Sequence, residues 1–359
     1  MPDYKEIRVN TLPAYTVTIG PGLLKNCGGL LRKTLPVCRV AVVTDSIVGP
    51  LYLETVTESL KAAGYTVSAY EFPAGEGSKN LETLSGILEF LASERLTRSD
   101  CLAALGGGVA GDMAGFAAAC YLRGIRYVQL PTTLLSAVDS SVGGKTAIDL
   151  KAGKNLAGAF LQPAAVLCDT DCLKTLPPEV LADGAAEAIK TAVLSDPGLF
   201  NSLEDGMAPL LDPAALIAGC VAYKAGVVER DEREQGERKL LNLGHTVGHA
   251  IEKCSGYTVP HGHAVAAGLA IIARASARLG WTSGNGARTA ERICSALRLT
   301  GLPVSTEYTP EALAEAALAD KKRAGDSITI VVPKEIGACA LMEIPVSELL
   351  FVIGTGWEA

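Results

Sequence analysis

The sequence predicts two domains: a mixed α/β domain with a largely parallel sheet, followed by a mostly α-helical domain. The first observation is the length of 359 residues, because domains average roughly 100–200 residues. The second is an alternation of strand-like and helix-like segments in the first half, which is typical of a parallel sheet covered by helices. The third is an alanine-rich helical texture from about residue 177 onward. We therefore divide the chain into residues 1–176 and 177–359.

The individual elements follow from local periodicity and turn residues. Strands are expected at 39–45 and 65–72, from residue 101 into the three glycines at 106–108, and from residue 127. Helices are expected at about 50–63 and 79–94. In the second half, five segments have helical periodicity, and only DSITIVVP near residue 330 predicts a strand.

Composition and charge exclude several classes of protein. Apolar residues make up 48% and charged residues 20%, which is ample for two cores and excludes intrinsic disorder. The net charge of −7 disfavours nucleic acid and anionic membranes as partners. No apolar stretch approaches the roughly 20 residues of a membrane span, and the start does not resemble a secretory signal. With ten cysteines and no CxxC pair, we expect reduced thiols and a cytoplasmic protein.

Residues 106–111 (GGGVAG) fit the pattern GxGxxG between an expected strand and an expected helix. Glycines allow the backbone to approach a pyrophosphate, and a helix N-terminus offers it free N–H groups. No acidic residue ends the next strand at the usual distance, but Asp45, at the end of an earlier strand, could take the ribose role. The motif favours a dinucleotide site, with a ligand-free glycine turn as the alternative.

A polar run, VDSSVGGKTAIDLKAGKN, occupies residues 138–155. Its Lys145 and Lys154 stand with Asp139 and Asn155 among glycines and hydroxyl residues, as in anion-binding loops. The alternative is a solvated surface loop. A mononucleotide P-loop is not supported, because GxxxxGK[ST] is absent.

All four histidines, His245, His249, His261 and His263, fall within nineteen residues. The first two have the i, i+4 spacing that places side chains on one helix face, but HExxH is absent, so a metalloprotease is not indicated. A catalytic metal site usually has three protein ligands and one open position. Glu187, in an otherwise apolar helical segment, is a candidate third ligand. The cluster predicts a metal site, with satisfied core histidines as the alternative.

These features together suggest redox chemistry on a polyhydroxylated, phosphorylated substrate. A nucleotide would take a hydride, and a metal would hold and acidify adjacent hydroxyls. Just upstream of the histidines, Lys224, Glu234, Arg238 and Asn242 lie in and around VERDEREQGERK, a kind of run that is usually a solvated helix face.

The motifs resemble those of the 3-dehydroquinate synthase family. The matching stretches run from about residue 106 to 322. They are GGGVAGDMAGFAAACYLRGI, PTTLLSAVDSSVGGKTAIDLKAGKN, LKTLP, GAAEAIK, KAGVVERDEREQGERKLLNLGHTVGHAIE, HGHAV and DKK. The resemblance implies a Rossmann-like α/β NAD-binding domain over 1–176, an α-helical metal- and substrate-binding domain over 177–359, and a homodimer.

The resemblance also implies residue roles. Zinc or cobalt would be bound by Glu187, His245 and His261, and His249 would face the substrate and assist proton movement. The substrate contacts would be Arg123, Asp139, Lys145, Asn155, Lys190, Lys224, Arg238, Asn242, His249 and Lys321. Of the site residues, the implied catalytic ones are His249, Lys145, Asp139 and Glu234. NAD would be held by Asp45, Glu76, Lys79, Gly107, Gly108, Val109, Asp112, Thr132, Thr133, Lys154 and Thr175.

The implied reaction converts 3-deoxy-D-arabino-heptulosonate 7-phosphate into 3-dehydroquinate and phosphate. NAD oxidises the hydroxyl at carbon five, and the resulting ketone acidifies the neighbouring C–H bond, so phosphate is eliminated. Re-reduction, ring opening and an intramolecular aldol step complete the cycle and regenerate NAD. In the family, Arg238 and Lys145 lie near the substrate carboxylate, and Arg123 reaches the phosphate from the neighbouring subunit.

Three other functions stay open. Another sugar phosphate cyclase would share the fold and the NAD–metal chemistry, but without a substrate carboxylate it would not need Arg238 and Asn242. An NAD- and metal-dependent alcohol or glycerol-phosphate dehydrogenase would release reduced cofactor. A zinc-binding or nucleotide-sensing protein would bind without turnover. One departure from the family is that His263 stands where the family usually has glutamate (HGEAV), which changes the charge beside a candidate metal ligand.

Overall fold

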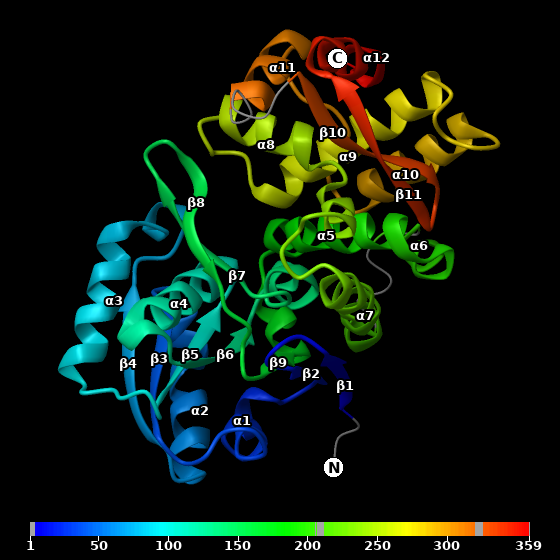
Figure 1. The fold of residues 1–359 in the computed structure, drawn as a ribbon. Coiled ribbons are helices and arrows are strands. Elements are labelled where there is room, and N and C mark those ends of the chain that lie inside the picture. The colour runs from blue at the N-terminus through cyan, green and yellow to red at the C-terminus, as the bar shows by residue number, and fades with distance from the viewer. Residues whose placement is uncertain (1–3, 205, 207–211, 320–325, 359) are drawn as a thin grey trace. The chain divides into compact units, whose positions relative to one another are not determined.

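The computed structural model describes residues 4–204, 206, 212–319 and 326–358, and Figure 1 shows their path. They form two compact units. The first is Met1–Leu176 with Lys224–Glu232, and the second is Pro177–Tyr223 with Arg233–Ala359. The division predicted from the sequence placed residues 224–232 in the second domain, whereas here they group with the first unit.

A seven-stranded sheet forms the centre of the first unit (Figure 1). Its order is β1-β2-β9-β6-β5-β3-β4, and all neighbouring pairs are parallel except β1 with β2. The largely parallel α/β fold predicted from the alternation is therefore confirmed, whereas β1 and β2 were not expected. The strands are β1 (Lys5–Val9), β2 (Tyr15–Gly20), β3 (Arg39–Asp45), β4 (Thr66–Phe72), β5 (Cys101–Gly106), β6 (Arg126–Pro131) and β9 (Val166–Asp169).

Helices cover both faces of this sheet. Successive residues of a strand point to opposite faces, so Val40 and Val42 of β3 pack with α1 and α2, while Ala41 and Val43 pack with α3 and α4. The helices are α1 (Cys27–Leu31), α2 (Gly49–Ala62), α3 (Leu81–Ser93) and α4 (Gly108–Cys120).

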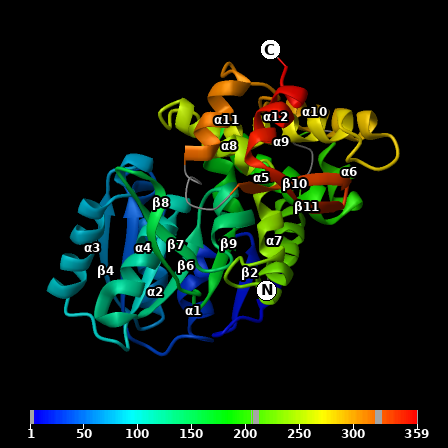
Figure 2. The ribbon, with the colours of Figure 1, turned by 45° about the horizontal axis from the view of Figure 1, so that its top comes forward.

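The polar run at 138–155 forms more regular structure than a surface loop. Most of it belongs to an antiparallel hairpin of β7 (Lys145–Leu150) and β8 (Gly153–Phe160). Figures 1 and 2 both show this hairpin beside α4, with which β7 and β8 make contact.

The second unit is mostly helical, as predicted, and α9 packs against α5, α8, α10 and α12. Its helices are α5 (Pro178–Ser195), α6 (Pro197–Leu203), the first part of α7 (Pro213–Arg230), α8 (His245–Cys254), α9 (His261–Arg278), α10 (Gly286–Leu299), α11 (Pro310–Ala319) and α12 (Leu349–Gly356). The strand expected near residue 330 is β10 (Ser327–Glu335), and it pairs with β11 (Ala338–Pro345), a second strand that the sequence did not indicate.

The helices and the cysteines can be compared with the expectations from composition. Within the described ranges, no helix combines the length and the apolar character that a membrane crossing requires. The ten cysteines are free thiols, six of them buried.

Candidate functional site

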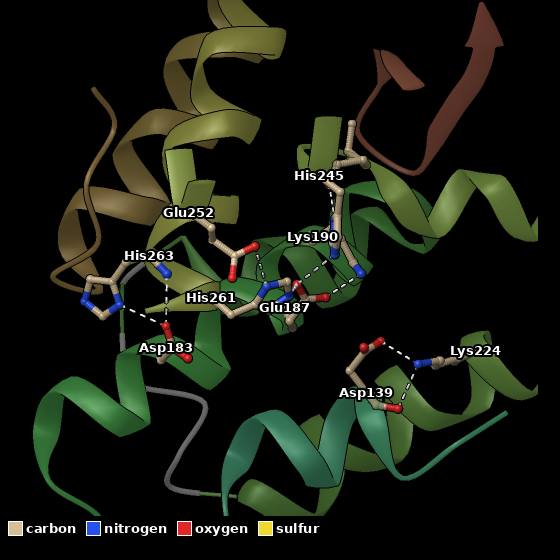
Figure 3. Close-up of polar contacts among 10 residues, drawn as sticks. Asp139, Asp183, Glu187, Lys190, Lys224, His245, Glu252, His261 and His263 are labelled. Atoms are coloured by element: carbon tan, nitrogen blue, oxygen red, sulfur yellow. Dashed lines mark hydrogen bonds and ion pairs between the residues drawn. The ribbon is translucent and has the colours of Figure 1, made fainter. Parts of the chain in front are cut away.

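Three helices of the second unit bring Glu187, His245 and His261 together (Figure 3). Glu187 lies in the middle of α5, and the two histidines are the first residues of α8 and α9. The Nε2 atoms of His245 and His261 both lie 3.6 Å from Oε1 of Glu187. Glu187 is fully buried. The three residues expected to bind metal thus form one compact cluster.

Glycines allow the three helices to approach closely. A Cβ atom at Gly268 of α9 would overlap the carbonyl oxygen of Gly244, the residue before α8. A Cβ atom at Gly262 would overlap the carbonyl oxygen of Asp183 on α5. Gly244 itself has φ +80°, a conformation that glycine adopts without strain. The starts of α8 and α9, which carry the two imidazoles, are therefore held by direct backbone contact.

The charges of the cluster are strongly coupled. Burial alone would raise the pKa of Glu187, but Lys190 and the two histidines hold that pKa well below its usual range. Burial and the nearby Lys190 lower the pKa of His245 to about 3. Burial also works against a charged His261, but Glu187 and Glu252 outweigh it and raise the pKa of His261 to about 10.

The cluster fits a divalent metal ion. Both carboxylate oxygens of Glu187 are buried without a hydrogen-bond partner in the described part of the chain, although Lys190 forms an ion pair with Oε2. Burying a carboxylate in this way is costly unless a cation compensates. Two imidazoles and one glutamate are the ligands of one class of catalytic zinc site, which leaves a fourth position for water or substrate.

A cavity of about 650 Å³ adjoins the cluster within the second unit. His245, His249 and Asn242 line one side of it, and Thr329 and Glu343 of the β10–β11 hairpin line another. His249 is exposed, and its ring centroid lies 5.3 Å from that of His245. The histidine expected to face the substrate therefore borders an open cavity next to the metal cluster.

His263 is not part of the metal cluster. Its backbone N–H and its ring Nδ1 both lie 3.0 Å from Oδ1 of Asp183, so α9 is tied to α5 near its first turn. No group of possible metal ligands among the described residues includes His263. Sequence reasoning did not identify Asp183, which is 80 positions away from His263 along the chain.

We expect His263→Glu to keep its metal and to lose stability. The substitution removes the ring contact and brings a second carboxylate beside Asp183, at a cost of about 1.5 kcal/mol. Adding Asp183→Asn to the same chain should restore most of the loss, because the repulsion is relieved. Metal content and the thermal midpoint of the single and double variants test this. A metal-free His263→Glu protein would instead make His263 a ligand.

All but one of the candidate NAD residues lie at or after the C-terminal ends of parallel strands in the first unit. The neighbours β3 and β5 form the point at which the order of the sheet reverses, with β4 on one side and β6 and β9 on the other. Such a switch point is the usual ligand site of open α/β sheets. These residues are Asp45 at the end of β3, Glu76 and Lys79 after β4, Gly107, Gly108, Val109 and Asp112 after β5, Thr132 and Thr133 after β6, Lys154 in β8, and Thr175 after β9.

Lys154 of the β7–β8 hairpin is the one exception to this placement. Its Nζ lies 3.4 Å from Oε1 of Glu76, one of the residues that follow β4.

The geometry at the switch point fits a dinucleotide. A Cβ atom at Gly106 would lie 2.7 Å from Cβ of Ala110 and 3.4 Å from Oδ2 of Asp45, so only glycine fits this turn. No side chain among the described residues caps the N-terminus of α4, which leaves its N–H groups for an anion. The hydroxyl of Thr132 is buried and has no hydrogen-bond partner among the residues that the structure describes.

Lys79 is the buried centre of a polar network whose other members are partly exposed. Its Nζ lies 2.6 Å from Oδ2 of Asp112 and donates a hydrogen bond of 2.6 Å to Oδ1 of Asn155. Asp149, which the sequence did not single out, accepts from the backbone N–H of Asn155 and donates its own N–H to the carbonyl of Lys79. Burial opposes the charge on Lys79, but Asp112 and Glu76 raise its pKa. The network ties the β7–β8 hairpin to the segment after β4.

The candidate substrate residues have diverse settings. In the first unit, Nζ of Lys224 lies 2.8 Å from both the backbone carbonyl and Oδ1 of Asp139 (Figure 3). Lys145 begins β7 and is exposed. In the second unit, Asn242 donates to Oε1 of Glu234 at 2.7 Å.

Of four further candidate substrate residues, two are buried, one is exposed and one lies outside the described residues. Arg238 is 1% exposed and does not line the cavity, although its neighbour Lys239 does. Lys190 is equally buried, in its ion pair with Glu187. Arg123 is exposed in a tight turn with φ +68°. Lys321 lies outside the described residues.

Solved structures place this architecture among the sugar phosphate cyclases. A 2-deoxy-scyllo-inosose synthase complexed with carbaglucose-6-phosphate, NAD⁺ and Co²⁺ has a TM-score of 0.86 and 25% identity, and 98% of this chain and 99% of that one are covered. The 2-epi-5-epi-valiolone synthase from Streptomyces hygroscopicus, with NAD⁺ and Zn²⁺ bound, has a TM-score of 0.86 and 27% identity over 99% and 98%. A probable glycerol dehydrogenase from Sinorhizobium meliloti, at 16% identity and a TM-score of 0.64, shares the fold alone.

Comparisons of sequence identify the family within that class. The family models described as 3-dehydroquinate synthase N-terminal and C-terminal match residues 69–183 and 184–323. The 3-dehydroquinate synthase of Xylella fastidiosa is 46% identical over 347 residues, 93% of each chain. That of Geobacter metallireducens is 44% identical over 96% of this chain and 97% of its own. The chain belongs to the 3-dehydroquinate synthase family, as its motifs predicted.

Proposed function

We propose that this chain converts 3-deoxy-D-arabino-heptulosonate 7-phosphate to 3-dehydroquinate and phosphate, with NAD and a divalent metal ion as cofactors. The observation that carries the proposal is the buried cluster of Glu187, His245 and His261 beside a cavity lined by His249 and Asn242, in a chain of this family. Zinc and cobalt are both candidates, as the two solved cyclases bind one or the other.

The residues of the second unit divide the work between holding and proton transfer. When bound, NAD supplies a hydride acceptor and the metal polarises the substrate oxygens. Glu187, His245 and His261 would hold the metal through one carboxylate and two imidazoles. His249, exposed on the cavity wall, would accept the proton of the substrate hydroxyl and return it. Asn242, held by Glu234, would orient a polar group of the substrate.

The first unit would provide NAD binding and positive charge. The residues after β3, β4, β5, β6 and β9 would hold the dinucleotide, with its pyrophosphate at the start of α4. Lys145 would neutralise the substrate carboxylate. Asp139, Asn155 and Lys224, which pairs with Asp139, remain proposed substrate contacts of this unit. In the second unit, Arg238 would also neutralise the carboxylate, and Lys190 remains a proposed contact.

The decisive experiment follows phosphate and reduced cofactor in one reaction. The protein is given the heptulosonate phosphate, NAD, and Zn²⁺ or Co²⁺, and phosphate release is recorded together with the absorbance of NADH. Steady phosphate release without net NADH, with dehydroquinate as the product, is the expected result. NADH accumulating with substrate would indicate a dehydrogenase. If no phosphate is released, sugar phosphates without a carboxylate are tested, because they are the substrates of other cyclases.

We expect Arg123→Ala to raise the Michaelis constant for the phosphorylated substrate about 10- to 100-fold, the loss of a charged hydrogen bond worth roughly 1.5–3 kcal/mol. NAD affinity should be unchanged. Arg98→Ala is the matched control, because Arg98 donates to the carbonyl of Leu122 in the same turn without being a candidate phosphate ligand. A Michaelis constant equal to that of the unsubstituted protein would remove Arg123 from the substrate site.

The proposal includes a cytoplasmic homodimer in which Arg123 acts on the partner's substrate. Mixing Arg123→Ala and Glu187→Gln chains tests it, at a substrate concentration far below the raised Michaelis constant of Arg123→Ala, where each chain alone turns over little. After random pairing, half of the dimers are mixed and carry one intact site of two, so about a quarter of the full activity should return. No recovery in mixed dimers would place Arg123 in the site of its own subunit.

A further inference from the structure

Both imidazoles of the metal cluster have their second ring nitrogen facing an oxygen atom outside the cluster. Nδ1 of His245 lies 3.1 Å from the carbonyl oxygen of Leu243. Nδ1 of His261 lies 3.5 Å from Oε2 of Glu252 (Figure 3). In both residues, Nε2 is the atom that faces Glu187. The two rings therefore point the same nitrogen, Nε2, toward Glu187.

This arrangement determines which nitrogen can bind a metal. A neutral imidazole has one N–H donor and one nitrogen with a free lone pair. A backbone carbonyl and a carboxylate only accept hydrogen bonds, so Nδ1 of both rings keeps its hydrogen when a metal ion displaces the second proton of His261. The Nε2 lone pairs are then free to bind that metal beside the carboxylate of Glu187.

Glu252 has the position and the burial of a residue that orients His261. It is only 2% exposed, and it lies on α8, which packs directly against α9. It follows His249 by three residues, so the two share one face of α8. A carboxylate in this setting is stabilised by a donor such as the His261 ring.

A second metal site could use the same atoms differently. Ligand atoms of His249, Glu252 and His261 also lie within 4.8 Å of one another. A metal there would need the Nδ1 lone pair of His261, which turns the hydrogen of the ring toward Glu187. His261 would then no longer bind a metal together with the buried Glu187 and His245. His249 would bind the second metal instead of facing the cavity.

We propose that Glu252 is a positioning residue that fixes the ring of His261, so that one metal ion binds at Nε2 of His245 and His261. The proposal rests on the metal site of the proposed function and assigns the group of His249, Glu252 and His261 to orientation rather than to a second metal. A carboxylate behind a ligating histidine typically contributes 10- to 100-fold in metal affinity.

The first test is the Co²⁺ affinity of Glu252→Gln, measured by chelator competition on the full-length chain. Affinity should fall about 10- to 100-fold, with one metal per chain and the same cobalt absorption bands. Asp183→Asn is the matched control, because it makes the same change at a carboxylate that contacts His263 rather than a cluster ligand, and its affinity should change by less than about threefold. Unchanged affinity in a folded Glu252→Gln protein overturns the proposal, as do two metals per chain of which this variant loses one.

A second measurement needs no substitution. The chain has four histidines, so ¹⁵N-labelled histidine gives a simple spectrum of the Zn²⁺-loaded protein. Hydrogen at Nδ1 of both His245 and His261 is expected, and hydrogen at Nε2 of His261 overturns the proposal. Both experiments measure metal binding alone. If the unsubstituted protein binds metal in this way but releases no phosphate, the proposed reaction fails while the assignment of Glu252 stands.

Discussion

Glu187→Gln should leave a folded protein that holds almost no metal and turns over at least about 10³-fold more slowly, the upper range for losing one preorganised group in an active site. Glu187 is the only carboxylate of its cluster, and both imidazoles face the same oxygen. An amide carries no charge to offset the cation, so a single substitution removes the electrostatic basis of the site.

Two further variants make this result interpretable. Lys190 loses its ion-pair partner in Glu187→Gln, so His245→Ala is the second variant, because it removes a ligand and keeps that pair. Glu179→Gln, an exposed change on the same helix, is the control and should retain metal and turnover. Metal content after gel filtration and the rate of phosphate release are measured together. Stoichiometric metal in Glu187→Gln or His245→Ala would reject the ligand assignment.

Lys79→Ala should strongly destabilise the first unit. Lys79 is 5% exposed, and its removal leaves the carboxylate of Asp112 without its partner at 2.6 Å. Breaking a buried pair from one side costs about 3 kcal/mol or more, which corresponds to roughly 6–12 °C in the midpoint for a unit of this size.

A double-mutant cycle separates the pair from simple packing. Asp112→Ala alone should also destabilise, whereas Lys79→Ala with Asp112→Ala should lose clearly less than the sum of the two, because no unpaired charge remains. Thermal and urea unfolding of the three variants, with NAD binding as a second readout, are the measurements. Additive losses would show that the two groups do not stabilise each other.

The first unit was predictable because its strands carry strong local signals. The run RVAVVTD at 39–45 is continuous and β-branched, as expected of a strand buried on both faces, and it became β3. The first strand, KEIRV, has only five residues and is mostly exposed at the edge of the sheet. Its alternation of polar and apolar residues is therefore too short to predict a strand. The strand ACALMEIP pairs with β10 over its whole length. Its alanine-rich start does not have the residue pattern of a strand, so the sequence alone did not predict it.

The candidate site was predictable only in part. The clustering of histidines and the isolated Glu187 indicated which residues to bring together, and the structure places them on three helix segments of one unit. Glu252 and Asp183 were not identified, because a single carboxylate in a helix has no local signal that distinguishes it from a solvated one. Their contacts depend on the packing of α8 and α5 against α9, which no short stretch of sequence encodes.

The glycine contacts between α8, α9 and α5 also have a consequence for how the metal is acquired. In small zinc-folded domains the ion itself organises the chain, and chelation unfolds them. Here the spacing of the ligand-bearing helix starts is set where the backbone of Gly268 meets Gly244 and that of Gly262 meets Asp183. Little conformational entropy then has to be lost on binding, because the ligands are already preorganised. Removal of the metal should leave a folded scaffold that takes the ion up again without refolding.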